Sequence, residues 1–384
     1  MQKMTHGSKW RLRPQSVFFW TILIILVASM YHNLLMHARD FVVYWKTACF
    51  VRSGGPVYSV ARDGAWVFKY PPWTFPLFLP FGFLNLTWAK TVYGILQVLA
   101  FAFILRWTFR ASEDTRAPCI VVFLFWGLWQ VNAQDGQISL FLIATWLWAG
   151  SPMALERLNL KTTLLLAACS SKIFTFYPLL SLGISWKAIR TTFFIFIAIF
   201  LPLSLPALWV TKDHSLFHLG QSYAQAALSG GHLLLDADVR GRSNQGLTGL
   251  CLRLLQIPRE QTLADIFCCL IVGSLIAFGW HRLSRNMRFQ DRFVGWIGLT
   301  PVIHPLPFWY SFVMAFPLAS LSLSASLRAK KRTLTLASSL LGIAMITILT
   351  QKTLGSLGTI LEFYSVKSWG VLLCCLALKI SQKN

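Results

Sequence analysis

A single carboxylate, Asp40, follows directly after the first long apolar segment of the chain. Acids are scarce, because the 384 residues contain 13 aspartates and glutamates against 35 lysines and arginines. A carboxylate at the membrane edge that faces a polar pocket can take a proton from a substrate hydroxyl, which is general-base chemistry. Taken alone, Asp40 is explained more simply as half of an interfacial ion pair with its neighbour Arg39. Its significance therefore depends on what the rest of the chain places near it.

Cationic side chains in two other segments could bind an anionic substrate group. Lys172 lies in SSKIFTFYP, and a lysine inside a membrane segment is costly and therefore a functional candidate. Arg240 and Arg242 follow closely after the tripeptide DAD, and their forked guanidinium groups suit phosphate recognition. The two acids of that tripeptide, Asp236 and Asp238, have a spacing used in divalent-metal sites, but so short a match is weak. We therefore expect no cofactor, with a divalent metal at these acids as the weaker alternative.

The composition is that of an integral membrane protein. Hydrophobic residues make up 55% of the chain and charged residues 12%, with a mean hydropathy of +0.57. Apolar runs near the ~20 residues that cross a bilayer recur along the chain. We predict one all-α domain over residues 1–384, with roughly 10–12 membrane helices and no separate soluble domain. Lysines and arginines in short loops explain the net charge of +22 better than nucleic-acid binding does.

The basic loops also predict how the helices are oriented. The basic N-terminus is placed in the cytoplasm, residues 17–36 cross outward, and the final spans return the C-terminus to the cytoplasm. Residues 37–71 and 210–262 then form two large extracytoplasmic loops. The polar turns of the chain are all predicted on this outer face, so they could converge on one site.

Residues 41–52 of the first outer loop are predicted to form an amphipathic helix along the membrane surface. Phe41 and Trp45 share one side of such a helix, which is expected to face the membrane. Asp40 and Tyr44 share another side, which is expected to face a polar pocket.

Two further segments are too irregular for full spans. The proline-rich stretch at 73–84 is expected to be half-buried or re-entrant. Residues 161–184 have basic flanks that are both cytoplasmic by charge, so we expect two half-helices with Lys172 near the outer turn.

Six short motifs occur in a recognisable order along the chain. The first three are DFVVYWKTACFVRSGGPVYS, KYPPWTFPLFLPFGFL and QDGQISLFL. The last three are SSKIFTFYPLL, NQGLTGLCLRLL and HPLPFWYSFVMAFPL. Each motif alone is weak, but six in this order, all on the predicted outer face, are much stronger. Together they resemble glycosyltransferase family 87, in the C-type (GT-C) superfamily of multi-spanning membrane glycosyltransferases.

The resemblance implies transfer of mannose or an arabinofuranose-like sugar from a polyprenyl-phosphate donor to an extracytoplasmic lipid or glycan acceptor of the cell envelope. The family places its catalytic base on the first outer loop, where the matching position is Asp40. In an inverting transfer one base suffices, because a phosphate leaving group needs no acid, but the departing phosphate needs positive charge around it. The residues expected to bind that phosphate are Lys172, Arg240, Arg242 and His304. The residues expected to line the substrate pocket are Arg39, Tyr44, Tyr70, Gln137, Asn244 and Trp309.

Two other classes of protein are weighed against this interpretation. A transporter or lipid flippase would predict paired half-sequences and ionisable groups in mid-span, whereas the sequence has no convincing repeat and its polar groups gather at one rim. A non-catalytic membrane subunit with the same fold would predict that Asp40 is dispensable. The glycosyltransferase is the preferred hypothesis.

Overall fold

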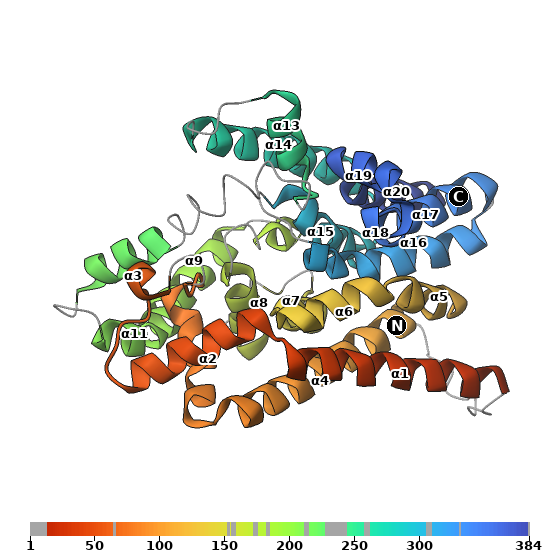
Figure 1. The fold of residues 1–384 in the computed structure, drawn as a ribbon. Helices are drawn as coiled ribbons and strands as arrows, with labels where there is room; N and C mark the ends of the chain where they lie inside the picture. Colours follow the sequence, from red (N-terminus) through yellow and green to blue (C-terminus); the bar gives the residue numbers. More distant parts are fainter. Residues whose placement is uncertain are drawn as a thin grey trace.

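The computed structural model describes residues 14–63, 67–151, 154, 159–171, 176–181, 185–210, 215–226, 244–256, 262–304, 309–329 and 332–382. Of these residues 83% are helical, and no strand occurs among them, which confirms the predicted all-α class. In Figure 1 the N-terminal helices, in red and orange, lie along one side of the molecule, and the last helices, in blue, lie across from them. The middle of the chain, in yellow, lies between the two.

The N-terminal helices form the frame that holds Asp40. Helix α1 (Pro14–Met36) ends just before α2 (Arg39–Arg52), and Ala38 between them has φ 44°, a left-handed conformation that turns the chain. A short α3 (Val60–Asp63) and two 3-10 helices, η2 (Pro72–Leu77) and η3 (Leu79–Phe83), lead to α4 (Leu86–Ala111). Asn85 caps α4 by accepting a hydrogen bond from the Trp88 backbone N–H at 3.0 Å.

The proline-rich stretch forms η2 and η3 rather than a spanning helix, as expected from its prolines. It packs directly under α2, because a Cβ on Gly82 would lie 2.7 Å from the Ala48 carbonyl carbon. Arg52 Nη1 donates to the Gly82 carbonyl at 2.8 Å, and Trp45 Nε1 donates to the Leu84 carbonyl at 3.0 Å. Helix α2 is thus fixed on η3 by a close backbone approach and by two side-chain hydrogen bonds.

The two sides predicted for α2 are only partly right. Phe41 is buried, but Tyr44, which was expected to face a polar pocket, is buried too, as are Thr47 and Ala48. Trp45 is only half-buried. The hydrophobic pattern fails here because a buried tyrosine is tolerated wherever its hydroxyl finds a partner, and Tyr44 has one in Tyr70.

The middle of the chain is built from short and broken helices. Helices α5 (Arg116–Leu124) and α6 (Trp126–Asp135) follow each other at a bend of 55°, and α7 (Ser139–Ala149) comes next. Then come α8 (Leu160–Ser170), the 3-10 helix η5 (Tyr177–Ser181), α9 (Trp186–Ile195), the π-helical turn η6 (Phe196–Phe200), α10 (Leu201–Leu203) and α11 (Leu205–Trp209). The predicted outer turn of the two half-helices, with Lys172, lies outside the described residues.

The C-terminal part begins with α13 (Leu247–Leu254), α14 (Thr262–Ser284), α15 (Phe289–Ile303) and the 3-10 helix η8 (Trp309–Ala315). It continues with α16 (Phe316–Arg328), α17 (Arg332–Thr347), α18 (Gln351–Leu354), α19 (Ser356–Phe363) and α20 (Val366–Ser381). Helices α17 and α20 approach so closely that a Cβ on Gly370 would lie 2.5 Å from the Gly342 carbonyl oxygen.

Several helices are long and apolar enough to cross a membrane. By length and composition the described residues contain five such helices, or up to seven if each bent pair counts as one span. Three shorter apolar helices add to these, at Ser139–Ala149, Leu160–Ser170 and Thr333–Thr347. The chain is therefore a multi-pass membrane protein in which full-length helices occur beside short and bent ones. The roughly 10–12 helices and their orientation remain predictions.

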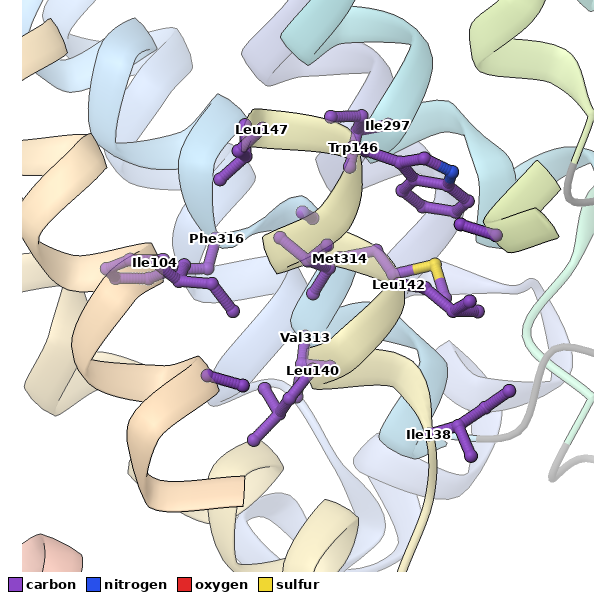
Figure 2. Close-up of a cluster of buried hydrophobic side chains, with 14 of the residues drawn as sticks. Ile104, Ile138, Leu140, Leu142, Trp146, Leu147, Ile297, Val313, Met314 and Phe316 are labelled. Carbon is purple, nitrogen blue, oxygen red and sulfur yellow. The ribbon is translucent and has the colours of Figure 1, made fainter. Parts of the chain in front are cut away.

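Helix α7 lies in a buried apolar cluster that joins both halves of the chain. Figure 2 shows Leu140, Leu142 and Trp146 of α7 close to Val313 and Met314 of η8. Side chains of α4, α15 and α16 complete the cluster, which is buried throughout. Because interiors of this kind are close-packed, α7 and η8 hold fixed positions, and the turn just before α7, which carries Gln137, is positioned with them.

Candidate active site

Asp40 is the second residue of α2, at the end of the helix where the backbone favours an anion. The carboxylate is half-exposed, and its Oδ2 accepts a hydrogen bond from Gln137 Nε2. Gln137 itself is only 1% exposed. The two residues lie 97 positions apart in the sequence, so the fold brings together the first and third of the predicted motifs.

The turn that carries Gln137 is fixed against both α2 and α4. Gly136 has φ 65°, and a Cβ there would lie 3.0 Å from Phe41 Cβ, so the end of α6 touches the start of α2. From α4, Tyr93 donates its hydroxyl to the Gly136 carbonyl at 3.0 Å, and Gln97 Nε2 donates to the Gln137 carbonyl at 2.5 Å. The backbone that presents the Gln137 amide to Asp40 therefore has little freedom.

Two tyrosines next to Asp40 form a buried hydrogen-bonded pair. The hydroxyls of Tyr44 and Tyr70 are 2.7 Å apart, and Tyr58 donates its hydroxyl to the Tyr70 carbonyl at 2.7 Å. Burial first, and then neighbouring negative charge that includes Asp40, raises the pKa of Tyr44 and of Tyr70 well above the ordinary value. Both hydroxyls are therefore protonated at neutral pH, and they act as hydrogen-bonding groups rather than as bases.

Tyr310 and Tyr93 complete the surroundings of Asp40, and neither was a predicted site residue. Both interact electrostatically with Asp40, and the Tyr310 hydroxyl forms a side-chain hydrogen bond with Gln137. A signal for Tyr93 was present, because Tyr93 and Gln97 share one side of an otherwise apolar helix. Tyr310 directly follows Trp309 in the last motif, but nothing in that pattern distinguishes it from its aromatic neighbours.

The predicted catalytic residue, Asp40, comes together with three of the predicted pocket residues, Tyr44, Tyr70 and Gln137. Arg39 is exposed, and it interacts electrostatically with Asp135 at the end of α6.

Asn244 is bonded into a different part of the molecule. It is buried, and its Oδ1 accepts from the Gly246 backbone N–H at 3.0 Å. Its carbonyl accepts from Arg253 Nη1 at 3.1 Å, and Arg253 also donates to the Phe363 carbonyl at 2.9 Å and to Ser365 Oγ at 2.7 Å. Asn244 is thus held at the start of α13, and Arg253 joins α13 to the end of α19 and to Ser365, the N-cap residue of α20.

The predicted phosphate and metal residues are only partly described. His304 ends α15, its backbone N–H donating to the Thr300 carbonyl at 3.0 Å, and Trp309 begins η8. Lys172, Arg240, Arg242, Asp236 and Asp238 all lie outside the described residues. Within the described part of the chain, no three His, Cys, Asp or Glu side chains gather as a metal site would require.

Short and broken apolar helices around a carboxylate held at a helix start define a membrane protein whose polar site lies at helix ends. The model of glycosyltransferase family 87 matches residues 68–305, well over half of the chain. The chain therefore belongs to glycosyltransferase family 87, and its class of activity is sugar transfer. No curated protein and no solved structure matches it.

The family match covers only part of the candidate active site. Tyr70, Gln137 and His304 lie within the match, whereas Asp40 precedes it and Tyr310 follows it. Membership of the family therefore supports the class of reaction, whereas the support for a role of Asp40 comes from the residues around it.

Proposed function

We propose that the protein transfers a sugar, mannose or an arabinofuranose-like pentose, from a polyprenyl-phosphate donor to an extracytoplasmic lipid or glycan acceptor. The reaction proceeds with inversion, and Asp40 is its general base. The observation that carries the proposal is the hydrogen bond from Gln137 to Asp40, in a chain that belongs to a glycosyltransferase family. That bond supports a carboxylate kept ionised and oriented at the start of a helix.

The proposed step is a single displacement at the anomeric carbon. An acceptor hydroxyl gives its proton to the Asp40 carboxylate while its oxygen forms a bond to that carbon. The bond from the anomeric carbon to the phosphate oxygen breaks, and its electron pair leaves with the polyprenyl phosphate. Gln137 donates to Oδ2 and so holds the Asp40 carboxylate while it takes the acceptor proton.

The donor phosphate needs positive charge, because negative charge grows on it as the bond breaks. We propose Lys172, Arg240, Arg242 and His304 for this role. The support for these four residues is their basic character and their positions in the sequence, on the predicted outer face.

The buried tyrosines support a role in shaping the acceptor side of the site. Tyr44 and Tyr70 remain protonated, so they can bond substrate hydroxyls without competing with Asp40 for the proton. Arg39, Asn244 and Trp309 are proposed as further pocket residues. We propose that the reaction needs no metal, since a phosphate departs without an acid; chelator should then leave the rate unchanged.

The proposed orientation places both termini in the cytoplasm and the active site on the opposite face of the membrane. The basic N-terminus and the basic loops support it. A single cysteine introduced at His37, in a variant whose eight native cysteines are replaced, should react with a membrane-impermeant maleimide added from outside. Labelling only after the membrane is opened would reverse the orientation.

The test of the function is transfer by the purified protein in lipid nanodiscs. Polyprenyl-phosphate mannose and polyprenyl-phosphate arabinofuranose are offered with glycan acceptors extracted from a strain that lacks the protein. We expect transfer from one of the two donors, and a product whose anomeric configuration by NMR is opposite to that of the donor. Absence of transfer from both donors would reject the proposed donor class, and retention of configuration would reject the single displacement.

A further inference from the structure

We propose that Tyr310 is a positioning residue for the base. Its hydroxyl acts through the Gln137 carboxamide and fixes how the Asp40 carboxylate is presented to the acceptor. The inference rests on the proposed function where it takes Asp40 as the base. The contact itself joins a segment beyond the family match to a residue before it.

The contact runs through one side chain. Gln137 Nε2 donates to Asp40 Oδ2, and the same carboxamide is hydrogen-bonded to the Tyr310 hydroxyl. Gln137 is almost fully buried, and its carbonyl is held by Gln97. Because the backbone of Gln137 is fixed and its side chain is buried, the motion left to the side chain is rotation of its carboxamide group.

That rotation matters because the two ends of a carboxamide have opposite polarity. With the nitrogen toward Asp40, two N–H donors are offered, one for the carboxylate and one for a second oxygen. With the amide turned over, Gln137 Oε1 would face the carboxylate and repel it. The Tyr310 hydroxyl, bonded to this carboxamide, can accept from the second N–H or donate to Oε1. Either bond holds the amide with its nitrogen toward Asp40, so it stabilises the ionised and correctly aimed form of the base.

Tyr310 is held firmly enough to do this. It is the second residue of η8, which packs against α6 and α7. Figure 2 shows the next turns of η8, at Val313 and Met314, in the same buried cluster as Leu140 of α7. Gln137 lies three residues before Leu140, so one apolar cluster fixes both partners of the hydrogen bond.

The other groups around Asp40 are committed differently. Arg39, beside it on α2, interacts with Asp135. Tyr44 from α2 bonds to Tyr70, and Tyr93 from α4 donates to a backbone carbonyl. Among the tyrosines described near Asp40, Tyr310 is the one bonded to the donor of Asp40, so it is the one whose loss should act through Gln137.

The position of Tyr310 also links its contact with Gln137 to the binding of the donor. Tyr310 comes six residues after His304, which we propose for the donor phosphate. His304 ends α15, and α15 packs against η8, so a donor bound at His304 would stabilise η8 and, through one amide, the aim of the base. The base would then be best aligned when a donor is present.

The variant Tyr310→Phe tests the role because it removes one oxygen and keeps the ring. We expect kcat to fall about tenfold, as for loss of a group that supports a general base, with each KM changed less than about twofold. The pH at which activity falls on the acid side should rise, because the carboxylate loses support for its charged form. Tyr364→Phe, which removes the hydroxyl of an exposed tyrosine in the C-terminal part, is the matched control and should leave all three quantities unchanged.

A double-mutant cycle separates this route from a merely structural effect. If Tyr310 acts through Gln137, the variant Gln137→Ala/Tyr310→Phe should lose no more activity than Gln137→Ala alone. Losses that multiply, or a Tyr310→Phe variant with wild-type kcat and pH profile, would overturn the proposal while transfer by the wild type still upholds the proposed function.

A chemical readout tests the same contact without relying on transfer. An apolar carbodiimide modifies protonated carboxyl groups, and mass spectrometry of the digested protein reports the modified fraction of Asp40 against pH. In Tyr310→Phe and in Gln137→Ala the midpoint of this curve should move to higher pH, by no more in Tyr310→Phe than in Gln137→Ala, and in Tyr364→Phe it should stay. Unchanged midpoints in both site variants would overturn the inference, whichever sugar the protein transfers.

Discussion

Two regions of the molecule bury polar side chains, and they do so in opposite ways. In the C-terminal region, Arg253 and Lys367 donate to backbone carbonyls, and Glu362 accepts from the first backbone N–H of α18. Around Asp40 the decisive contact joins two side chains, the Gln137 carboxamide and a half-exposed carboxylate. The first region satisfies the ends of helices, whereas in the second a buried amide binds a carboxylate that is half-exposed.

The comparison distinguishes buried polar side chains that stabilise the fold from those that hold a reactive group. Helix ends leave backbone groups without partners, and a buried side chain that bonds them is a structural solution. Asp40 also lies at a helix end, but it is held by an amide whose own backbone is fixed by two further side chains. Substitutions in the first region should therefore act on stability, and those in the second on rate.

The largest contrast is expected between the two acids. Asp40→Asn should lower kcat by roughly 100- to 10,000-fold, the range of general-base catalysis, with a melting temperature close to that of the wild type. Glu362→Gln should do the reverse, because Lys367 nearby would lose the charge with which it interacts. Transfer rates per folded molecule and melting curves in nanodiscs measure both. Equal losses of rate in the two variants would remove the distinction.

A smaller contrast is expected between two left-handed glycines. Gly136 and Gly355 have φ of 65° and 58°, so alanine strains the backbone at both. A Cβ meets Phe41 Cβ at 3.0 Å at the first position and nothing within 4 Å at the second. Gly136→Ala should therefore displace Gln137 and lower kcat about tenfold, whereas Gly355→Ala should cost about 1–2 kcal/mol of stability and keep kcat. A Gly136→Ala enzyme with wild-type kcat would show that the turn tolerates movement.

Arg253→Met should lower the free energy of unfolding by about 2 kcal/mol, because three hydrogen bonds to Asn244, Phe363 and Ser365 are lost. Chemical unfolding followed by tryptophan fluorescence measures this loss. Since Asn244 is a proposed pocket residue, the kinetics sharpen the comparison: a raised KM at constant kcat would assign Asn244 to substrate binding. A fall in kcat as large as that of Gln137→Ala would join the two regions into one site.

The smallest effect is an alkaline loss of stability. Folding raises the pKa of Tyr44 and Tyr70, so the stability linked to their protonated forms is complete below the ordinary tyrosine pKa of about 10. As the pH rises above that value, the unfolded chain ionises first and the folded state loses stability. Melting temperature measured from pH 8 to 11 should fall less steeply in Tyr44→Phe than in the wild type. Parallel curves would indicate that the pair is not buried as described.

The class of fold could be predicted from the sequence, as could the choice of Asp40 as a candidate, and the reasons are local. Apolar runs specify spanning helices, prolines specify the irregular stretch at η2 and η3, and an isolated acid is visible in a basic chain. The pairing of Asp40 with Gln137 depends on contacts across 97 residues, and a shared predicted face could only suggest it. The place of Tyr310 near Asp40 and the contacts that hold Asn244 depend on how the last helices pack. The hydrophobic pattern does not predict this packing.

The central claim is that Asp40 is the base, and binding and chemistry measured in one variant test it most directly. For Asp40→Asn we predict that the polyprenyl-phosphate sugar binds with a Kd within about twofold of the wild-type value. The rate of a single turnover with bound donor and saturating acceptor should fall at least about 100-fold. A single-turnover rate close to that of the wild type would contradict the assignment of Asp40 and the account of the site built on it.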